Sequence, residues 1–126
     1  MSVEQVANRL VELCRQGDFE TCHNELYSEQ AISIEPKGAT VERVEGIAAI
    51  KEKGELWKNM IKETHANEIG NPVIAENFFA VPWKMEVTYQ GATEPISMEE
   101  ICVYQVKEGK IVSEQFFFTP LLEEEE

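Results

Sequence analysis

The chain has 126 residues, of which 24 are acidic, 11 are basic and 43% are hydrophobic. This length fits a single domain, and the apolar fraction is enough to fill one core without metals or disulfides. The net charge of −13 repels phosphate backbones and anionic lipid surfaces, so we expect no nucleic-acid partner and no membrane partner.

The three cysteines, Cys14, Cys22 and Cys102, are odd in number and widely spaced, which favours reduced thiols over a disulfide framework. The N-terminus lacks the pattern of a secretory signal, and no apolar run approaches the roughly 20 residues of a membrane span. We therefore expect a cytoplasmic protein. Two histidines and singly scattered glycines match no metal signature and no phosphate-binding loop, so we expect no metal and no cofactor.

Three helices are predicted. Apolar residues recur at helical spacing before Gly17, which is suited to ending the first helix: Val3, Val6, Leu10 and Leu13. Asp18 can cap a second helix that ends at Tyr27. A third, longer helix begins near Gly46, with lysines and glutamates outside an apolar stripe formed by Ile47, Ile50, Gly54, Trp57, Met60 and Ile61.

Alternation then predicts strands. The first is the segment 31–35, which Pro36 ends. The period changes to two from Thr64 onward, and further strands cover 72–75, 79–89, 96–106 and 110–118. Two inward faces follow: Phe79, Val81, Trp83, Met85, Val87 and Tyr89 on one strand, and Ile96, Met98, Glu100, Cys102, Tyr104 and Val106 on the next.

The last hairpin allows two registers. A three-residue loop at 107–109, with Gly109 in the left-handed position, turns Val112, Glu114, Phe116 and Phe118 inward beside Cys102 and Tyr104. A two-residue turn at 108–109 would instead turn Ser113, Gln115 and Phe117 inward. We favour the first register. Residues 1–120 are predicted to form the single domain, and 121–126 an acidic, disordered tail without function.

The order of these elements resembles the nuclear transport factor 2-like superfamily, which includes ketosteroid isomerases and SnoaL-like polyketide cyclases. The resemblance covers nearly the whole chain. It is carried by Gly17-Asp18, Leu26-Tyr27, the segments 31–36, 45–50 and 80–91, and the closing segment 103–112. It implies an α+β fold in which a cone-shaped, curved antiparallel sheet wraps around the three helices and leaves a cavity open at one end.

The resemblance also implies roles for particular residues. Ketosteroid isomerases use an aspartate just before a proline at the end of the first strand as general base, and Glu35 before Pro36 matches that position. Their oxyanion donors match Leu10 and Cys102 here, and the acidic residue of SnoaL-like cyclases matches Phe116, so neither activity carries over directly.

The inward faces predict a pocket for a small apolar molecule, one that could carry a carbonyl group. Its expected lining is Trp57, Val81, Trp83, Met85, Glu100, Cys102, Glu114, Phe116 and Phe118. We expect the two tryptophans to face each other across the cavity. Glu100 and Glu114 would be desolvated, and would be protonated, bonded to each other or in contact with a ligand. The alternative is that strand ends expose them to water.

Two functions remain open. In the first, the chain is a cofactor-independent isomerase, cyclase, hydratase or lyase with Glu35 as base. Its polar partner would be Tyr104, which we take as the second catalytic residue, or else Glu100 or Glu114. In the second, it is a binding protein or dimeric accessory module without chemistry. Ile101, Val103 and Phe117 would face outward, and family members commonly dimerise through this surface, so we expect a homodimer.

Overall fold

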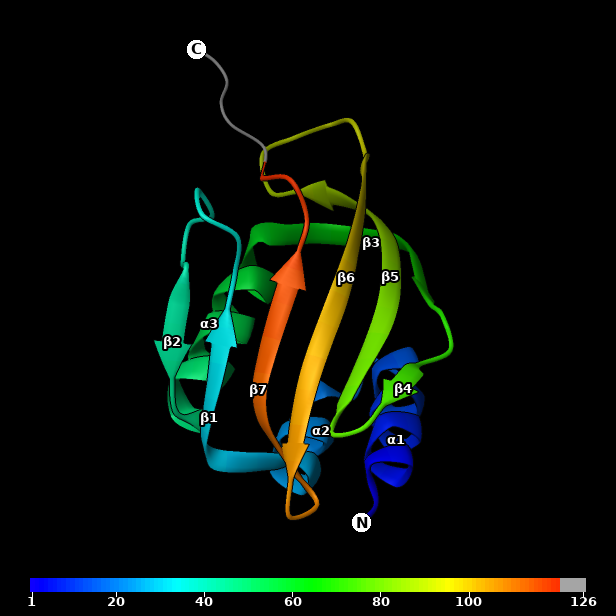
Figure 1. The fold of residues 1–126 in the computed structure, drawn as a ribbon. Coiled ribbons are helices and arrows are strands. Elements are labelled where there is room, and N and C mark those ends of the chain that lie inside the picture. Colours follow the sequence, from blue (N-terminus) through cyan, green and yellow to red (C-terminus); the bar gives the residue numbers. More distant parts are fainter. Residues whose placement is uncertain (121–126) are drawn as a thin grey trace.

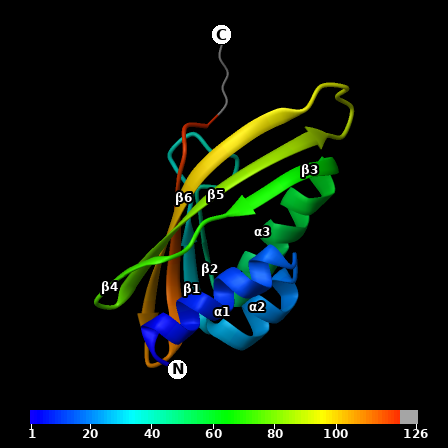
Figure 2. The same cartoon turned by 90° about the vertical axis from the view of Figure 1, so that its right-hand side faces the viewer.

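The computed structural model describes residues 1–120, so the predicted tail at 121–126 lies outside the described residues. Within 1–120 a curved sheet carries three helices on its concave side (Figures 1 and 2). The fold class predicted from the sequence is confirmed. The elements are α1 (Val3–Arg15), α2 (Phe19–Leu26), β1 (Tyr27–Ile34), β2 (Arg43–Glu45), α3 (Ile47–Met60), β3 (Ile61–Ile69), β4 (Val73–Ala75), β5 (Phe78–Tyr89), β6 (Ile96–Lys107) and β7 (Lys110–Phe117).

The two N-terminal helices have the termini that the sequence predicts. Ser2 caps α1 in a capping box with Gln5. Gly17, with a φ of 75°, follows the last turn, where left-handed backbone favours glycine. Asp18 caps α2 by accepting the Thr21 N–H at 3.1 Å. The two helices are therefore separated by a tight, locally encoded turn.

The strand order is β2-β1-β7-β6-β5-β3, and β4 also pairs with β5. Strands β1 and β7 are parallel, whereas the other pairs are antiparallel, so the sheet is mixed rather than wholly antiparallel. Strand β3 starts at Ile61, which the sequence pattern had assigned to the third helix, and it is mostly exposed. The parallel pairing places the end of β1 beside the middle of β7.

The β6–β7 hairpin differs from the favoured prediction in its loop. Lys107 pairs with Lys110, so the turn contains only Glu108 and Gly109, and the predicted three-residue loop is wrong. The two turn residues have φ values of 51° and 79°. Positive φ at both central residues is what a type I′ turn requires, and this turn matches the natural twist of paired strands.

A β-bulge then restores the inward face that the favoured register predicted. Val106 pairs with Ile111 but Gln105 pairs with Ser113, so Val112 is the extra residue. Ile111, rather than Val112, is consequently buried. Beyond the bulge Glu114 lies opposite Tyr104, and the predicted facing of this part of β7 is correct even though the turn was not.

Alternation along β5 and β6 separates a buried concave face from an exposed outer face. On the concave side Phe79, Val81, Cys102 and Tyr104 belong to a core that extends to α1 and α2. On the outer side Ile101 is 51% exposed. In the part of the chain that the structure covers, no helix is sufficiently long and apolar to cross a membrane.

Candidate functional site

Polar and apolar side chains form rows across the concave face. Register places Ser33 of β1 beside Glu114 of β7, which lies opposite Tyr104 of β6. The neighbouring row contains Phe116 and Cys102. Because each strand contributes alternate residues to this face, Ser33, Glu114 and Tyr104 form one row across three neighbouring strands.

Glu114 is the most deeply buried carboxyl group of this face, at 4% exposure. It accepts a hydrogen bond from the Tyr27 hydroxyl. Burial raises the pKa of Glu114, and the hydrogen bonds from Tyr27 and Ser33 and the charge of Lys53 oppose that effect. The side chain therefore points inward, as the favoured register predicted, and has the hydrogen-bond partners that a buried carboxyl group requires.

Lys53 of α3 is a central residue of the site that the sequence analysis missed. Its Nζ lies 2.5 Å from Ser33 Oγ and 2.8 Å from Glu35 Oε2. It also lies 5.0 Å from the centroid of the Phe116 ring, within range of a cation–π contact. Only 15% of the Lys53 side chain is exposed, so this is a partly buried cation.

The spacing of α3 contains the signal that could have located Lys53. Ile50, Lys53 and Trp57 follow one another at three and four residues and so share one face of a helix. The lysines of this helix were predicted to lie outside its apolar stripe. Met60, which it placed inside the stripe, is exposed instead. The predicted stripe therefore included the exposed Met60 and left out the partly buried Lys53.

Glu35 follows the last residue of β1, and its side chain is 20% exposed. A desolvated carboxylate was expected here, but Glu35 forms an ion pair with Lys53. Glu35 is consequently tied to α3 and to Ser33 through a single ammonium group.

Glu100 of β6 lies opposite Trp83 of β5. The pKa of its carboxyl group is raised to about 7, chiefly by burial and further by the charges of Glu35 and Glu114, while Lys53 lowers it. At neutral pH this group is present in both its protonated and ionised forms. Glu35 and Glu100 thus have opposed environments, one paired with a cation and the other desolvated among carboxyl groups.

Cys102 and Tyr104 were expected to line a pocket wall, but both side chains lie within the core. Both are almost fully buried, and burial raises the pKa of each. Tyr104 stacks on Phe79 with ring centroids 4.8 Å apart. Because the thiolate is the reactive form of cysteine, a raised pKa makes Cys102 a poor nucleophile.

The two tryptophans have different neighbours, which is a correction to the expectation that they face each other. Trp57 contacts Tyr89 edge to face, with ring centroids 5.9 Å apart. Trp83 stacks on Phe19 at 6.0 Å and donates its indole N–H to Asn67 Oδ1 at 2.6 Å. The remaining predicted lining residues are buried or half-buried: Val81, Met85, Glu100, Cys102, Glu114, Phe116 and Phe118.

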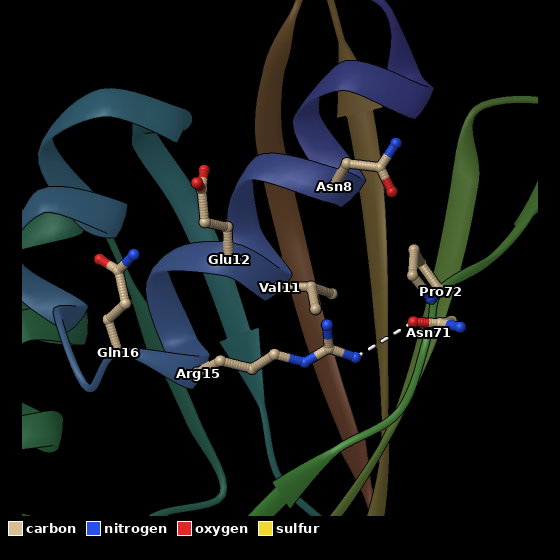
Figure 3. A pocket seen from close by; sticks show the side chains of 7 residues that line it. All are labelled: Asn8, Val11, Glu12, Arg15, Gln16, Asn71 and Pro72. Atoms are coloured by element: carbon tan, nitrogen blue, oxygen red, sulfur yellow. Dashed lines mark hydrogen bonds between the residues drawn. The ribbon is translucent and has the colours of Figure 1, made fainter.

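Two hollows lie away from these residues. One, of about 340 Å³, lies between α1 and the segment that joins β3 to β4 (Figure 3). There Arg15 donates to the Ile69 carbonyl at 2.7 Å and to Asn71 Oδ1 at 3.1 Å. The other, of about 370 Å³, is lined by Asn59, Met60, Tyr89 and Gln90. Neither hollow is lined by a residue of the predicted site.

Among residues 1–120, the histidine, cysteine, aspartate and glutamate side chains form no group of three or more that could hold a metal ion. The pKa values of Glu100 and Glu114 respond to the charges of Glu35 and Lys53.

Several solved structures are similar to this chain. A candidate SnoaL-like polyketide cyclase from Mesorhizobium loti is 27% identical, with a TM-score of 0.87 over 94% of this chain and 100% of that one. A candidate isomerase from Bacillus subtilis is 19% identical, with a TM-score of 0.71 over 95% and 91% of the two chains. A protein with a ketosteroid isomerase-like fold from Catenulispora acidiphila, in complex with trimethylamine, is 15% identical, with a TM-score of 0.66 over 78% and 72%.

Sequence comparison gives the family. None of the curated proteins matches this sequence. The family described as "SnoaL-like domain" matches residues 1–118, which is almost all of the described part of the chain. The elements of the fold, their order and this match agree, and the chain belongs to the SnoaL-like domain family.

Proposed function

We propose that this chain is a cofactor-independent acid/base catalyst that acts on a small apolar carbonyl compound, as an isomerase, cyclase, hydratase or lyase. Glu35 is the proton acceptor and Glu100 the proton donor. The observation that carries the proposal is the contrast between the two groups: Glu35 is paired with Lys53, while the pKa of Glu100 is raised to about 7. Two carboxyl groups in such different surroundings can divide the roles of base and acid.

The chemistry begins with removal of a proton from the carbon next to the carbonyl group. The C–H bond breaks, the proton forms an O–H bond with Glu35, and the electron pair moves to the carbonyl oxygen. Glu100 in its protonated form donates a hydrogen bond, or its proton, to that oxygen or to a second carbon. A donor whose pKa lies near the working pH can both give up and regain its proton.

The surroundings of the two carboxyl groups favour an apolar ligand. Phe116 and Cys102 lie side by side on β7 and β6, and Val81 follows on β5. Such a wall would exclude water from the reacting atoms and strengthen the electrostatic effects there. Tyr104, which we had expected to share the catalysis, is packed against Phe79 and has no proton-transfer role in this proposal.

The names of two similar proteins support this class of reaction. The Mesorhizobium loti protein is named a candidate polyketide cyclase, with carbohydrate phosphatase as a second name, and the Bacillus subtilis protein is named a candidate isomerase. Ring closure of a polyketide and isomerisation of a ketone both use an acid and a base. The alternative is a binding function without chemistry. It is favoured by the position of the two hollows, which lie outside the predicted site.

The proposal is tested with a β,γ-unsaturated cyclic ketone, whose isomerisation to the conjugated ketone changes its ultraviolet absorbance. We expect Glu35→Gln to abolish turnover and Glu100→Gln to lower kcat by about 100-fold or more, because each removes one proton-transfer group. Glu99→Gln, on the exposed side of the same strand as Glu100, serves as control and should retain full activity. Turnover that survives Glu35→Gln in a folded protein would show that the assigned base is wrong.

We also propose that the chain forms a homodimer through the outer face of the sheet. Ile101 and Phe117 are directly paired across β6 and β7, and about half of each side chain is exposed. Pro82 adjoins Ile101 on β5. A contiguous apolar area on an antiparallel sheet is typical of an interface between subunits.

A further inference from the structure

The ammonium group of Lys53 has capacity for one more partner. A lysine carries three N–H donors, and the contacts among residues 1–120 use two of them, on Ser33 and Glu35. The centroid of the Phe116 ring lies 5.0 Å from the same nitrogen. An aromatic face is a weak partner for an ammonium ion, and a ligand oxygen that approached the site could replace it.

The groups around Lys53 are mostly acidic. Glu35 on β1 contacts it directly, and Glu100 on β6 and Glu114 on β7 are close enough for their pKa values to respond to its charge. On α2, burial lowers the pKa of His23, and the charge of Lys53 contributes to that effect. Lys53 therefore provides positive charge in a site where further negative charge would otherwise be unfavourable.

Proton transfer to Glu35 would change this balance. The Glu35 carboxylate becomes neutral, so Lys53 loses its charged partner while it remains mostly buried. A partly buried, unpaired cation is unfavourable. The same step creates a negative charge on the substrate oxygen, and an ion pair with that oxygen would restore the lost interaction. The positive charge on Lys53 thus favours the state that follows proton transfer, provided the oxygen is within reach.

We propose that Lys53 is a catalytic residue that binds the enolate oxygen formed when Glu35 removes the substrate proton. This inference rests on the proposed function. It gives the enolate oxygen a cationic partner in addition to the hydrogen bond or proton that Glu100 donates. It also narrows the ligand to compounds whose oxygen becomes anionic, rather than purely apolar molecules.

The probe is 4-nitrophenol, whose phenolate oxygen resembles an enolate oxygen and whose neutral and ionised forms absorb at different wavelengths. We expect the wild-type protein to bind it preferentially as the phenolate, so that the bound probe ionises at a lower pH than the free probe. Lys53→Met keeps most of the side-chain length but removes the charge, and should weaken phenolate binding by about 100-fold. Lys58→Met, at an exposed position of the same helix, is the matched control and should bind as the wild type does.

Two further variants keep the test decisive if Lys53→Met fails to fold. Lys53→Arg retains the charge and should retain the preference for phenolate. Glu35→Gln removes the carboxylate that competes for the ammonium group, and should therefore bind phenolate more tightly than the wild type. Binding of the neutral phenol only, no binding by the wild type, or no gain in Glu35→Gln would each overturn the assignment.

The outcomes also separate this inference from the proposed function. If phenolate binding depends on Lys53 but the ketone is not isomerised, the proposed reaction is wrong and the anion site stands. If isomerisation requires Glu35 but is unchanged in folded Lys53→Met, the proposed reaction stands and the role of Lys53 is wrong. The two measurements use different ligands, so neither result depends on the other.

Discussion

Burial and pairing act in opposite directions on the carboxyl groups of the concave face. Glu35 shares an ammonium group with Ser33, whereas Glu100 faces the apolar side chain of Trp83. Two glutamates of the same face therefore have different surroundings, one ion-paired and the other desolvated. A difference of this kind is measurable in the stability of the protein as well as in any activity.

Glu100 should make stability depend on pH. The pKa of its carboxyl group is about 7 in the folded chain and 4.5 in a model peptide. Because the folded state binds this proton more tightly, its stabilising effect is fully present below 4.5 and is lost as the pH rises through 7. We expect Glu100→Gln, which stays neutral, to be more stable than the wild type above pH 7, by on the order of 1 to 3 kcal/mol once partial solvent exposure is allowed for.

The measurement is urea denaturation of both proteins below pH 4.5 and above pH 7. The advantage of Glu100→Gln should be present at the higher pH and small at the lower one. Glu99→Gln makes the same chemical change at an exposed position of β6 and should show little dependence on pH. An advantage of Glu100→Gln that is equal at both pH values would mean that desolvation does not shift this carboxyl group.

Individual residues of the site were predictable to the extent that they follow from alternation. The inward positions of Glu100 and Glu114 follow from a period of two, whereas Glu35 was proposed because its position before Pro36 matches that of the base in ketosteroid isomerases. Lys53 was missed because its role depends on Ser33, Glu35 and the distance between α3 and β1, and no pattern along the chain contains that distance. A charged residue on a helix is most often solvated, and only its tertiary contacts show otherwise.

At the level of elements, the prediction for the β6–β7 hairpin missed two features whose effects on the facing of β7 cancel. The chain uses a two-residue turn, which alone would have reversed the facing of β7, and a bulge at Val112 reverses it again. Glycine at 109 marked the turn, but its length depends on how Lys107 and Lys110 pair. A bulge leaves almost no trace in hydrophobic periodicity, so this part of the register could not be predicted from the sequence.

A substitution in the turn at Glu108 and Gly109 should increase the stability of the protein. Glu108 has a φ of 51°, a conformation that is unfavourable for most side chains and is tolerated best by glycine and asparagine. Asn-Gly is the preferred pair for a type I′ turn. We therefore expect Glu108→Asn to stabilise the protein by about 0.5 to 1 kcal/mol, a part of the ~1–2 kcal/mol that left-handed backbone costs an ordinary residue.

Thermal or urea denaturation checks this expectation. Glu94→Asn, in an exposed loop and without a positive φ, removes the same charge and should leave stability nearly unchanged. If the two variants were equally stable, the gain would come from reduced net charge rather than from backbone conformation. The comparison thereby isolates the contribution of the turn.

At the scale of the whole molecule, two properties act against each other in the proposed dimer. The sequence predicted the family and the outer face of the sheet. Association of two subunits, however, depends on the balance between the apolar patch on that face and the net charge of −13 on each chain. Interfaces of standard size bury about 800 Å² on each partner, which must outweigh the repulsion between two acidic proteins. Salt screens that repulsion, with a Debye length of about 10 Å at 0.1 M.

We therefore expect a dimer whose dissociation constant falls as salt is added, as measured by sedimentation equilibrium. Ile101→Glu places a charge in the centre of the apolar patch and should give a monomer at every salt concentration. Leu56→Glu makes a comparable change at an exposed position of α3, away from the sheet, and should leave the dimer intact. If both variants dissociated alike, added charge alone would be responsible. If neither did, the subunits would associate through a surface other than the outer face of β6 and β7.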